Sequence, residues 1–199
     1  MTNIWPEFES EIQAFEKSPT PQGANVFYGS SSIRLWENLA QCFPGVSVLN
    51  RGFGGSTLAE CLHFLPRVII PLHPATLVLC AGDNDLDQRV TPEQLLSVFR
   101  QFIARVREDA PLLPIAYISI KPSPIRFWNL SNIRRANALI QAATADLPHV
   151  TFLDLFPLML SPAGGSRPEL FTEDGLHMSP AGYALWTPHV RAWIDAQSS

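Results

Sequence analysis

The chain has 199 residues, of which 46% are hydrophobic and only 16% are charged. Soluble domains usually carry roughly 25% charged residues, so this composition excludes a disordered chain or a charged coiled coil and predicts a well-filled core. We therefore expect a single domain over residues 1–199. The formal net charge of −4 excludes the basic surface typical of nucleic-acid binding.

The number of cysteines and the hydropathy of the chain indicate in which cellular compartment the protein works. The three cysteines, Cys42, Cys61 and Cys80, are an odd number and lie too far apart for a zinc knuckle. The N-terminus, Met1 to Lys17, carries four glutamates and no apolar run, unlike a signal peptide. Prolines cut the apolar stretches well short of the ~20 residues that span a bilayer. We expect a cytoplasmic protein with reduced thiols and no membrane span.

Short apolar runs alternate along the chain with segments of helical period. The runs are rich in Val, Ile, Leu, Phe and Tyr and do not alternate with polar residues, as is typical of strands buried on both faces of a parallel sheet. The predicted strands are Asn25–Tyr28, Val46–Leu49, Thr76–Cys80, Ile115–Ile120 and Val150–Leu153.

Apolar side chains recur every three to four residues around these runs and predict amphipathic helices. Thr91, Pro92 and Gln94 predict a helix start with a capping box, and Pro188 is expected to kink or split the last helix. The stripes are Trp5/Phe8/Ile12/Phe15, Ile33/Trp36/Ala40/Phe43, Leu95/Phe99/Phe102/Val106, Ile133/Ala136/Ile140/Ala143/Leu147 and Tyr183/Trp186/Val190/Trp193.

Five strands alternating with helices predict an α/β fold, a three-layer α/β/α sandwich with a five-stranded parallel sheet. Right-handed crossovers then bring the loops that follow the strands to one edge. Four segments meet there: Gly29–Ser32, Asn50–Thr57, Ala81–Asp85 and Asp174–His177. A serine on a strand-to-helix turn, a glycine turn, an amide turn and Asp-x-x-His are the parts of a serine hydrolase.

Each segment also has a plainer interpretation. Strand-to-helix serines are more often N-caps than nucleophiles, glycines often only supply positive φ, and a lone histidine is usually structural. The order of the four segments favours the hydrolase. From the residues alone, any one of Ser30, Ser31 and Ser32 could face the cleft.

The four segments resemble the four sequence blocks of the SGNH, or GDSL-like, hydrolases, over about residues 26–186. The run Phe-Tyr-Gly-Ser-Ser-Ser-Ile-Arg-Leu-Trp is similar to the first block of the lysophospholipase and platelet-activating-factor acetylhydrolase-like branch. The family's Gly-Asp-Ser reads Gly29-Ser30-Ser31 here, so the aspartate before the nucleophile is missing. The resemblance implies a flavodoxin-like topology.

Carried over by position, the resemblance places the nucleophile on Ser31 and the rest of the catalytic triad on Asp174 and His177. It implies an oxyanion hole made by the backbone N–H groups of Ser31 and Gly55, rather than Gly54, and by the side chain of Asn84. The helix after Ser31 is expected to point its positive end at the same place.

We therefore expect a serine esterase acting on small-molecule acyl esters, with short-chain or acetyl esters favoured, through an acyl-enzyme on Ser31. The alternatives are a catalytically silent binding module on the same fold and a lysophospholipase with a longer-chain preference. No cofactor and no metal are expected: Asp83, Asp85 and Asp87 begin like a calcium loop, but Gln88 and Gln94 replace its glycine and glutamate. Nucleic acid is not an expected partner, and the oligomeric state stays open. Phe127 and Trp128 could line an acyl or sugar site, although ordinary core or rim packing is favoured.

Overall fold

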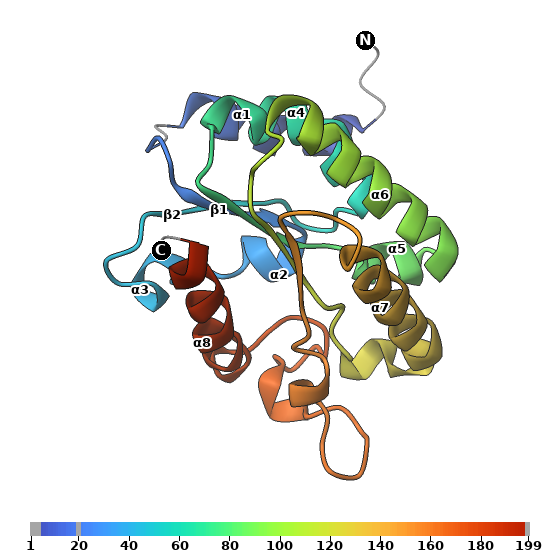
Figure 1. The fold of residues 1–199 in the computed structure, drawn as a ribbon. Helices are drawn as coiled ribbons and strands as arrows, with labels where there is room; N and C mark the ends of the chain where they lie inside the picture. The colour runs from blue at the N-terminus through green and yellow to red at the C-terminus, as the bar shows by residue number, and fades with distance from the viewer. Residues whose placement is uncertain (1–4, 19–20, 198–199) are drawn as a thin grey trace.

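The computed structural model describes residues 5–18 and 21–197, which share one parallel sheet (Figure 1). Its strand order is β2-β1-β3-β4-β5, the flavodoxin-like order of doubly wound proteins. The predicted fold class is confirmed. The strands are β1 (Asn25–Gly29), β2 (Val48–Gly52), β3 (Thr76–Cys80), β4 (Ile115–Ile118) and β5 (Val150–Leu153).

Helices cover both faces of the sheet, because alternate residues of the central strands point into two separate cores. Tyr28 and Leu79 face one core, whereas Phe27 and Val78 face the other. Figure 1 shows the two helical layers on either side of the strands. The first face carries α1 (Glu9–Lys17), α4 (Leu58–Val68), α6 (Pro92–Asp109) and α7 (Leu130–Thr144), and the second carries α2 (Ser31–Arg34), α3 (Leu39–Cys42) and α8 (Pro180–Gln197).

Short elements complete the chain. The helix α5 (Asp83–Asp87) follows β3, and short 3-10 helices connect the longer elements. These short helices are η1 (Pro6–Phe8), η2 (Ile70–Leu72), η3 (Pro124–Asn129), η4 (Pro157–Met159) and η5 (Pro168–Leu170). No helix within residues 5–18 and 21–197 is long and apolar enough to cross a membrane.

The local signals at Thr91 are confirmed. The Thr91 hydroxyl accepts a hydrogen bond from the Gln94 N–H at 3.2 Å, and the Gln94 side chain accepts one from the Thr91 N–H at 2.9 Å. Pro92 stands at the first position of α6. A second capping box, at Thr57 and Glu60, starts α4 in the same way and was not predicted.

Two predicted helices differ from the structure. The Ile33–Phe43 stripe forms two one-turn helices, α2 and α3, and the break between them brings Trp36 and Phe43 against Phe27 of β1, with ring centroids 5.7 and 5.2 Å from it. Aromatic packing against the sheet therefore outweighs continuation of the helix.

Pro188 does not split the last helix, and α8 runs from Pro180 to Gln197. The proline costs the helix one backbone hydrogen bond. Buried side chains on both sides of it, including Trp186 and Val190, hold the helix against the second face of the sheet.

Gly29 fixes how β1 meets β3 just before the serine segment. Its φ is +139°, and a Cβ built there would lie 2.0 Å from the Cys80 carbonyl oxygen. The same carbonyl accepts a hydrogen bond from the Ser30 N–H at 3.0 Å. A side chain at position 29 would therefore separate the two strands at the point where the serine turn begins.

We expect Gly29→Ala to lower the free energy of unfolding by about 3–5 kcal/mol, because backbone strain and steric overlap add. Gly45→Ala is the matched control: Gly45 also has a positive φ, +77°, but a Cβ there meets nothing within 4 Å, so the cost is only roughly 1–2 kcal/mol. Urea unfolding of both variants measures this difference. Equal losses would contradict the close approach of Gly29 to Cys80.

Candidate active site

A pocket at the carboxyl edge of the sheet brings together three of the predicted site residues. Ser31, Gly55 and His177 all line it, and its volume is about 520 Å³. They follow β1, β2 and β5, so they are far apart in sequence and meet because parallel strands end at the same edge.

Ser31 is the one of the three adjacent serines that lines this pocket. Ser30 and Ser32 are only 4% and 3% exposed, and the Ser32 carbonyl accepts a hydrogen bond from the Tyr183 hydroxyl. The burial of its two neighbours removes the ambiguity that the residues alone left open about which serine faces the cleft.

Asp174 and His177 lie on one turn and are hydrogen-bonded to each other. The His177 Nδ1 atom is 2.6 Å from Asp174 Oδ2. A carboxylate only accepts hydrogen bonds, so Nδ1 carries the hydrogen and Nε2 is the basic nitrogen.

The Asp174 carboxylate is stabilised as an anion by further donors. Its Oδ1 atom accepts hydrogen bonds from the His177 N–H at 3.0 Å, the Leu176 N–H at 2.8 Å and the Thr172 hydroxyl at 2.8 Å. These bonds, with the His177 N–H foremost, hold the pKa of Asp174 well below its usual range. The carboxylate therefore stays charged and can stabilise an imidazolium at His177.

The loop that carries Gly55 is fastened on both sides. Gly55 has a φ of +81°, which favours glycine. A Cβ there would meet nothing within 4 Å, so the need for glycine is conformational and not steric. On one side the Ser56 hydroxyl donates to the Phe53 carbonyl at 2.9 Å. On the other, both oxygens of Asp85 accept from the Leu58 N–H.

Asn84 is attached to the same loop. Its Nδ2 atom donates to the Ser56 carbonyl at 2.9 Å, one residue beyond Gly55. An amide nitrogen carries two hydrogens, so one is left for another acceptor. Asn84 thus contacts the loop that carries Gly55 and is not itself among the described residues that line the pocket.

The helix that begins at Ser31 is too short to carry a large dipole. α2 contains only four residues, so its aligned peptide dipoles are few and the field at its start is correspondingly small. We therefore expect the end of α2 to contribute little electrostatic stabilisation in this pocket.

The outer wall of the pocket is a feature that sequence reasoning missed. Glu7 and Phe8 of the N-terminal segment line it, together with Glu11 and Arg34. The Arg34 Nε atom donates to Glu11 at 2.9 Å and ties α1 to α2. The apolar stripe predicted helix packing for this segment but gave no signal that its polar side faces the site.

Phe127 and Trp128 are not among the described residues that line this pocket. Trp128 is 68% exposed and borders a separate pocket of about 290 Å³ with Arg89 and Pro92. Within the described part of the chain, no three His, Cys, Asp or Glu side chains gather as a metal-binding group.

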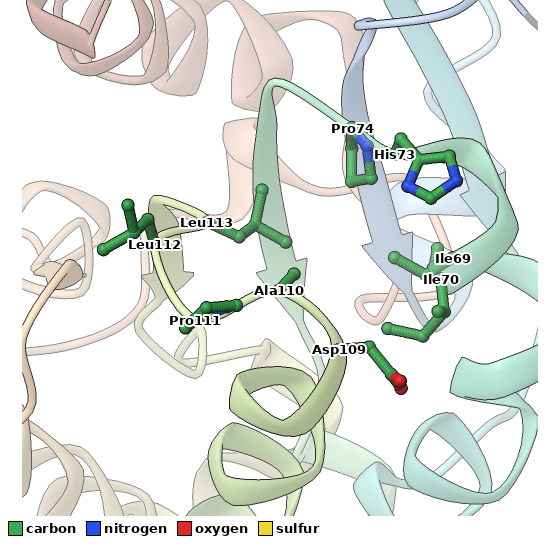
Figure 2. Close-up of a pocket in the computed structure, with 9 residues that line it drawn as sticks. All are labelled: Ile69, Ile70, His73, Pro74, Asp109, Ala110, Pro111, Leu112 and Leu113. Atoms are coloured by element: carbon green, nitrogen blue, oxygen red, sulfur yellow. The ribbon is translucent and has the colours of Figure 1, made fainter.

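Figure 2 shows a different pocket, at the opposite edge of the sheet. Its volume is about 460 Å³, and its lining includes Ile70, His73, Leu112 and Leu113. These residues precede β3 and β4, whereas the serine and histidine follow strands. The pocket in Figure 2 is therefore separate from the one that contains Ser31 and His177.

Comparison with known proteins places this geometry in a family. The model of the GDSL-like lipase/acylhydrolase family matches residues 21–185. The chain belongs to this family. The match covers all four predicted sequence blocks and confirms the resemblance, and the protein is accordingly a hydrolase.

Individual relatives of this GDSL-like hydrolase agree with the assignment. It is 28% identical over 198 residues to the platelet-activating factor acetylhydrolase IB subunit alpha1 of Bos taurus, covering 94% of this chain and 80% of that one. A GDSL-like lipase structure from Bacteroides thetaiotaomicron superposes with a TM-score of 0.79 at 21% identity, covering 97% and 98% of the two chains. A carbohydrate esterase family 3 structure from Talaromyces cellulolyticus superposes with a TM-score of 0.68 at 14% identity, covering 88% of this chain and 98% of that one. The two structures support the fold alone.

The ionisation of Asp174 in this hydrolase gives a direct test of the turn. Because its pKa is lowered in the folded chain, the stabilisation that the carboxylate gives the turn is complete above about pH 4 and is lost only in stronger acid. We expect the side-chain carboxyl ¹³C resonance of Asp174 to titrate well below the usual range of an aspartate, and Thr172→Val to raise its midpoint. A wild-type midpoint near 4, as in an unstructured peptide, would contradict the hydrogen-bonded turn.

Proposed function

We propose that this protein is a serine esterase that hydrolyses carboxylic acyl esters through an acyl-enzyme on Ser31. The observation that carries the proposal is the pocket lined jointly by Ser31, Gly55 and His177, with the His177 ring held by Asp174 at 2.6 Å. A nucleophile, a base oriented by a carboxylate and a candidate oxyanion donor are the groups that acyl transfer requires.

The acylation step follows from the tautomer of His177. Its Nε2 atom takes the proton of the Ser31 hydroxyl while Oγ attacks the ester carbonyl carbon. The tetrahedral intermediate then collapses, the bond to the alcohol oxygen breaks, and the imidazolium returns the proton to that oxygen. The charged Asp174 stabilises the imidazolium between the two proton transfers.

Deacylation repeats the same proton transfers with water. His177 removes a proton from a water molecule, the resulting hydroxide attacks the acyl carbon, and Ser31 leaves as its alcohol after reprotonation. In both steps negative charge develops on the former carbonyl oxygen. We assign its stabilisation to the N–H groups of Ser31 and Gly55 and to the remaining N–H of Asn84.

The charged side chains in the wall of the pocket support a preference for short acyl chains. Glu7, Glu11 and Arg34 account for three of the nine side chains and glycines around it. Burial of a long alkyl chain against charged groups would cost them hydration without offering them new hydrogen bonds. An acetyl group requires little apolar surface. The name of the Bos taurus relative, an acetylhydrolase, favours the same acyl group.

We also propose that the protein works in the cytoplasm on small-molecule esters. Its three cysteines are free, and Cys61 and Cys80 are buried. Unpaired thiols are usual in reducing compartments.

Replacement of the proposed nucleophile is the direct test of catalysis. We expect Ser31→Ala to lower kcat for p-nitrophenyl acetate by at least about 10³-fold, because the covalent route is lost while substrate binding remains. Circular dichroism and the thermal midpoint should show that the variant folds.

Ser30→Ala and Ser32→Ala are the matched controls, since they remove an adjacent hydroxyl from a buried position. Both should keep the wild-type rate within about tenfold. A loss at Ser30 equal to that at Ser31 would contradict the assignment of the nucleophile. A folded wild type with neither esterase activity nor labelling by a fluorophosphonate would favour the silent binding module.

The acyl-chain preference is tested with p-nitrophenyl esters from acetyl to decanoyl, each kept below its critical micelle concentration. We expect kcat/KM to fall as the chain lengthens, and Glu7→Leu to reduce that fall because it removes a charge from the wall of the pocket. A steady rise from acetyl to decanoyl would instead identify the longer-chain lysophospholipase alternative.

A further inference from the structure

A buried group of charges beside the active-site pocket has no part in the proposed proton transfers. Two cations, Lys121 and Arg126, meet two carboxylates, Asp83 and Asp87, with contacts of 2.5 to 3.0 Å. The side chains of Lys121 and Arg126 are only 4% and 12% exposed. Asp83 is largely buried as well, whereas Asp87 lies at the surface with 41% of its side chain exposed. Burial of three charges is costly unless they are paired with each other and hydrogen-bonded.

Arg126 reaches three side chains of the short helix α5. Its Nη1 atom donates to Asn84 Oδ1 at 3.0 Å and lies 3.0 Å from Asp83 Oδ2. Its Nη2 atom donates to Asp87 at 2.9 Å. The guanidinium is therefore held by two carboxylates on either side of Asn84, and its remaining contact is with the Asn84 amide.

These contacts determine which way the Asn84 amide points. A guanidinium only donates hydrogen bonds, so the amide atom that faces Arg126 must be the oxygen. The nitrogen then faces the Ser56 carbonyl and the Gly55 loop. A flipped amide would set N–H against guanidinium and oxygen against the Ser56 carbonyl oxygen, and both hydrogen bonds would be lost.

We propose that Arg126 is a positioning residue that fixes the Asn84 amide with its N–H toward the oxyanion site. This inference rests on the proposed esterase function. Arg126 acts through geometry rather than through its electric field, because the positive charges of Lys121 and Arg126 are balanced by the negative charges of Asp83 and Asp87. Lys121 holds Asp83, and Asp83 with Asp87 in turn holds the guanidinium.

The segment that carries Arg126 also contacts the triad turn. Arg126 belongs to η3, and the N–H of the preceding residue, Ile125, donates to the Gly175 carbonyl at 3.2 Å. Gly175 lies within the Asp174–His177 turn. The segment Ile125–Arg126 thus contacts both the proposed oxyanion donor, Asn84, and the turn that carries His177. It therefore helps to fix the position of one relative to the other.

The test measures kcat and KM for p-nitrophenyl acetate in Arg126→Gln, Arg126→Lys, Asn84→Ala and the double variant Arg126→Gln/Asn84→Ala. We expect Asn84→Ala to lower kcat by about 10²–10³-fold. Arg126→Gln should lower it by about 10- to 100-fold, since a displaced group costs less than a missing one. KM should stay within about twofold in both variants.

The double variant separates positioning from general stabilisation. If Arg126 acts through Asn84, Arg126→Gln has no further effect on kcat once Asn84 is alanine. The same fractional loss in both backgrounds would overturn the proposal. Arg126→Lys keeps the positive charge but lacks the planar guanidinium that donates to several acceptors at once. Its thermal midpoint should therefore be close to that of the wild type, while its kcat should stay as low as that of Arg126→Gln. Recovery of kcat by lysine would also overturn the proposal. Arg135→Gln, which breaks an exposed pair with Glu93, is the surface control.

The ¹⁵N side-chain resonances of Asn84 distinguish the two possible failures. Arg126→Gln should shift them and bring the two amide hydrogens into exchange, whereas Arg135→Gln should not. Unchanged Asn84 resonances in Arg126→Gln would overturn the positioning role, whatever the activity. An inactive wild type whose Asn84 resonances respond to Arg126→Gln would instead show that the amide is held as proposed and that the esterase function has failed.

Discussion

The site depends on one constraint, that all five strands run in the same direction. Parallel strands joined by right-handed crossovers release their loops at a single edge, and each loop of the site follows a strand end at that edge. The close approach of Gly29 to Cys80, with a Cβ position only 2.0 Å from the carbonyl oxygen, sets where the first loop leaves the sheet. Ser31, Gly55 and His177 meet in one pocket because of this geometry and not because of their sequence separation.

The loops at this edge are held by polar contacts rather than by regular helices. Asp174 fixes the His177 ring, Asp85 fixes the start of α4, and Arg126 fixes the Asn84 amide. The first contact lies within a single turn, whereas the other two join segments that are far apart in the sequence. Preorganised donors cost no reorganisation when charge develops in the transition state. A buried charge group next to the pocket is thus consistent with the chemistry we propose for it.

The sequence predicted the fold well where local signals agree with the tertiary structure. Thr76–Cys80 is a strand at its predicted bounds, and the capping box at Thr91 starts α6. The prediction was less accurate where contacts between distant side chains determine where a helix breaks or continues. Aromatic contacts with Phe27 divide the predicted Ile33–Phe43 helix. Of the kink or split expected at Pro188, the split does not occur, because α8 runs without interruption from Pro180 to Gln197. The positions of Glu7 and Arg126 left no sequence pattern, because Glu7 lines a pocket with residues far away along the chain and Arg126 contacts Asn84, 42 residues before it.

The most direct test of the account is to locate the serine that reacts with a fluorophosphonate by tandem mass spectrometry of the labelled protein. The reagent forms a stable adduct only with a serine activated by a neighbouring base. We predict one adduct, on Ser31, whose formation is abolished in His177→Ala. An adduct on Ser30 or Ser32, or labelling that persists without His177, would contradict the assignment of Ser31 as a nucleophile activated by His177.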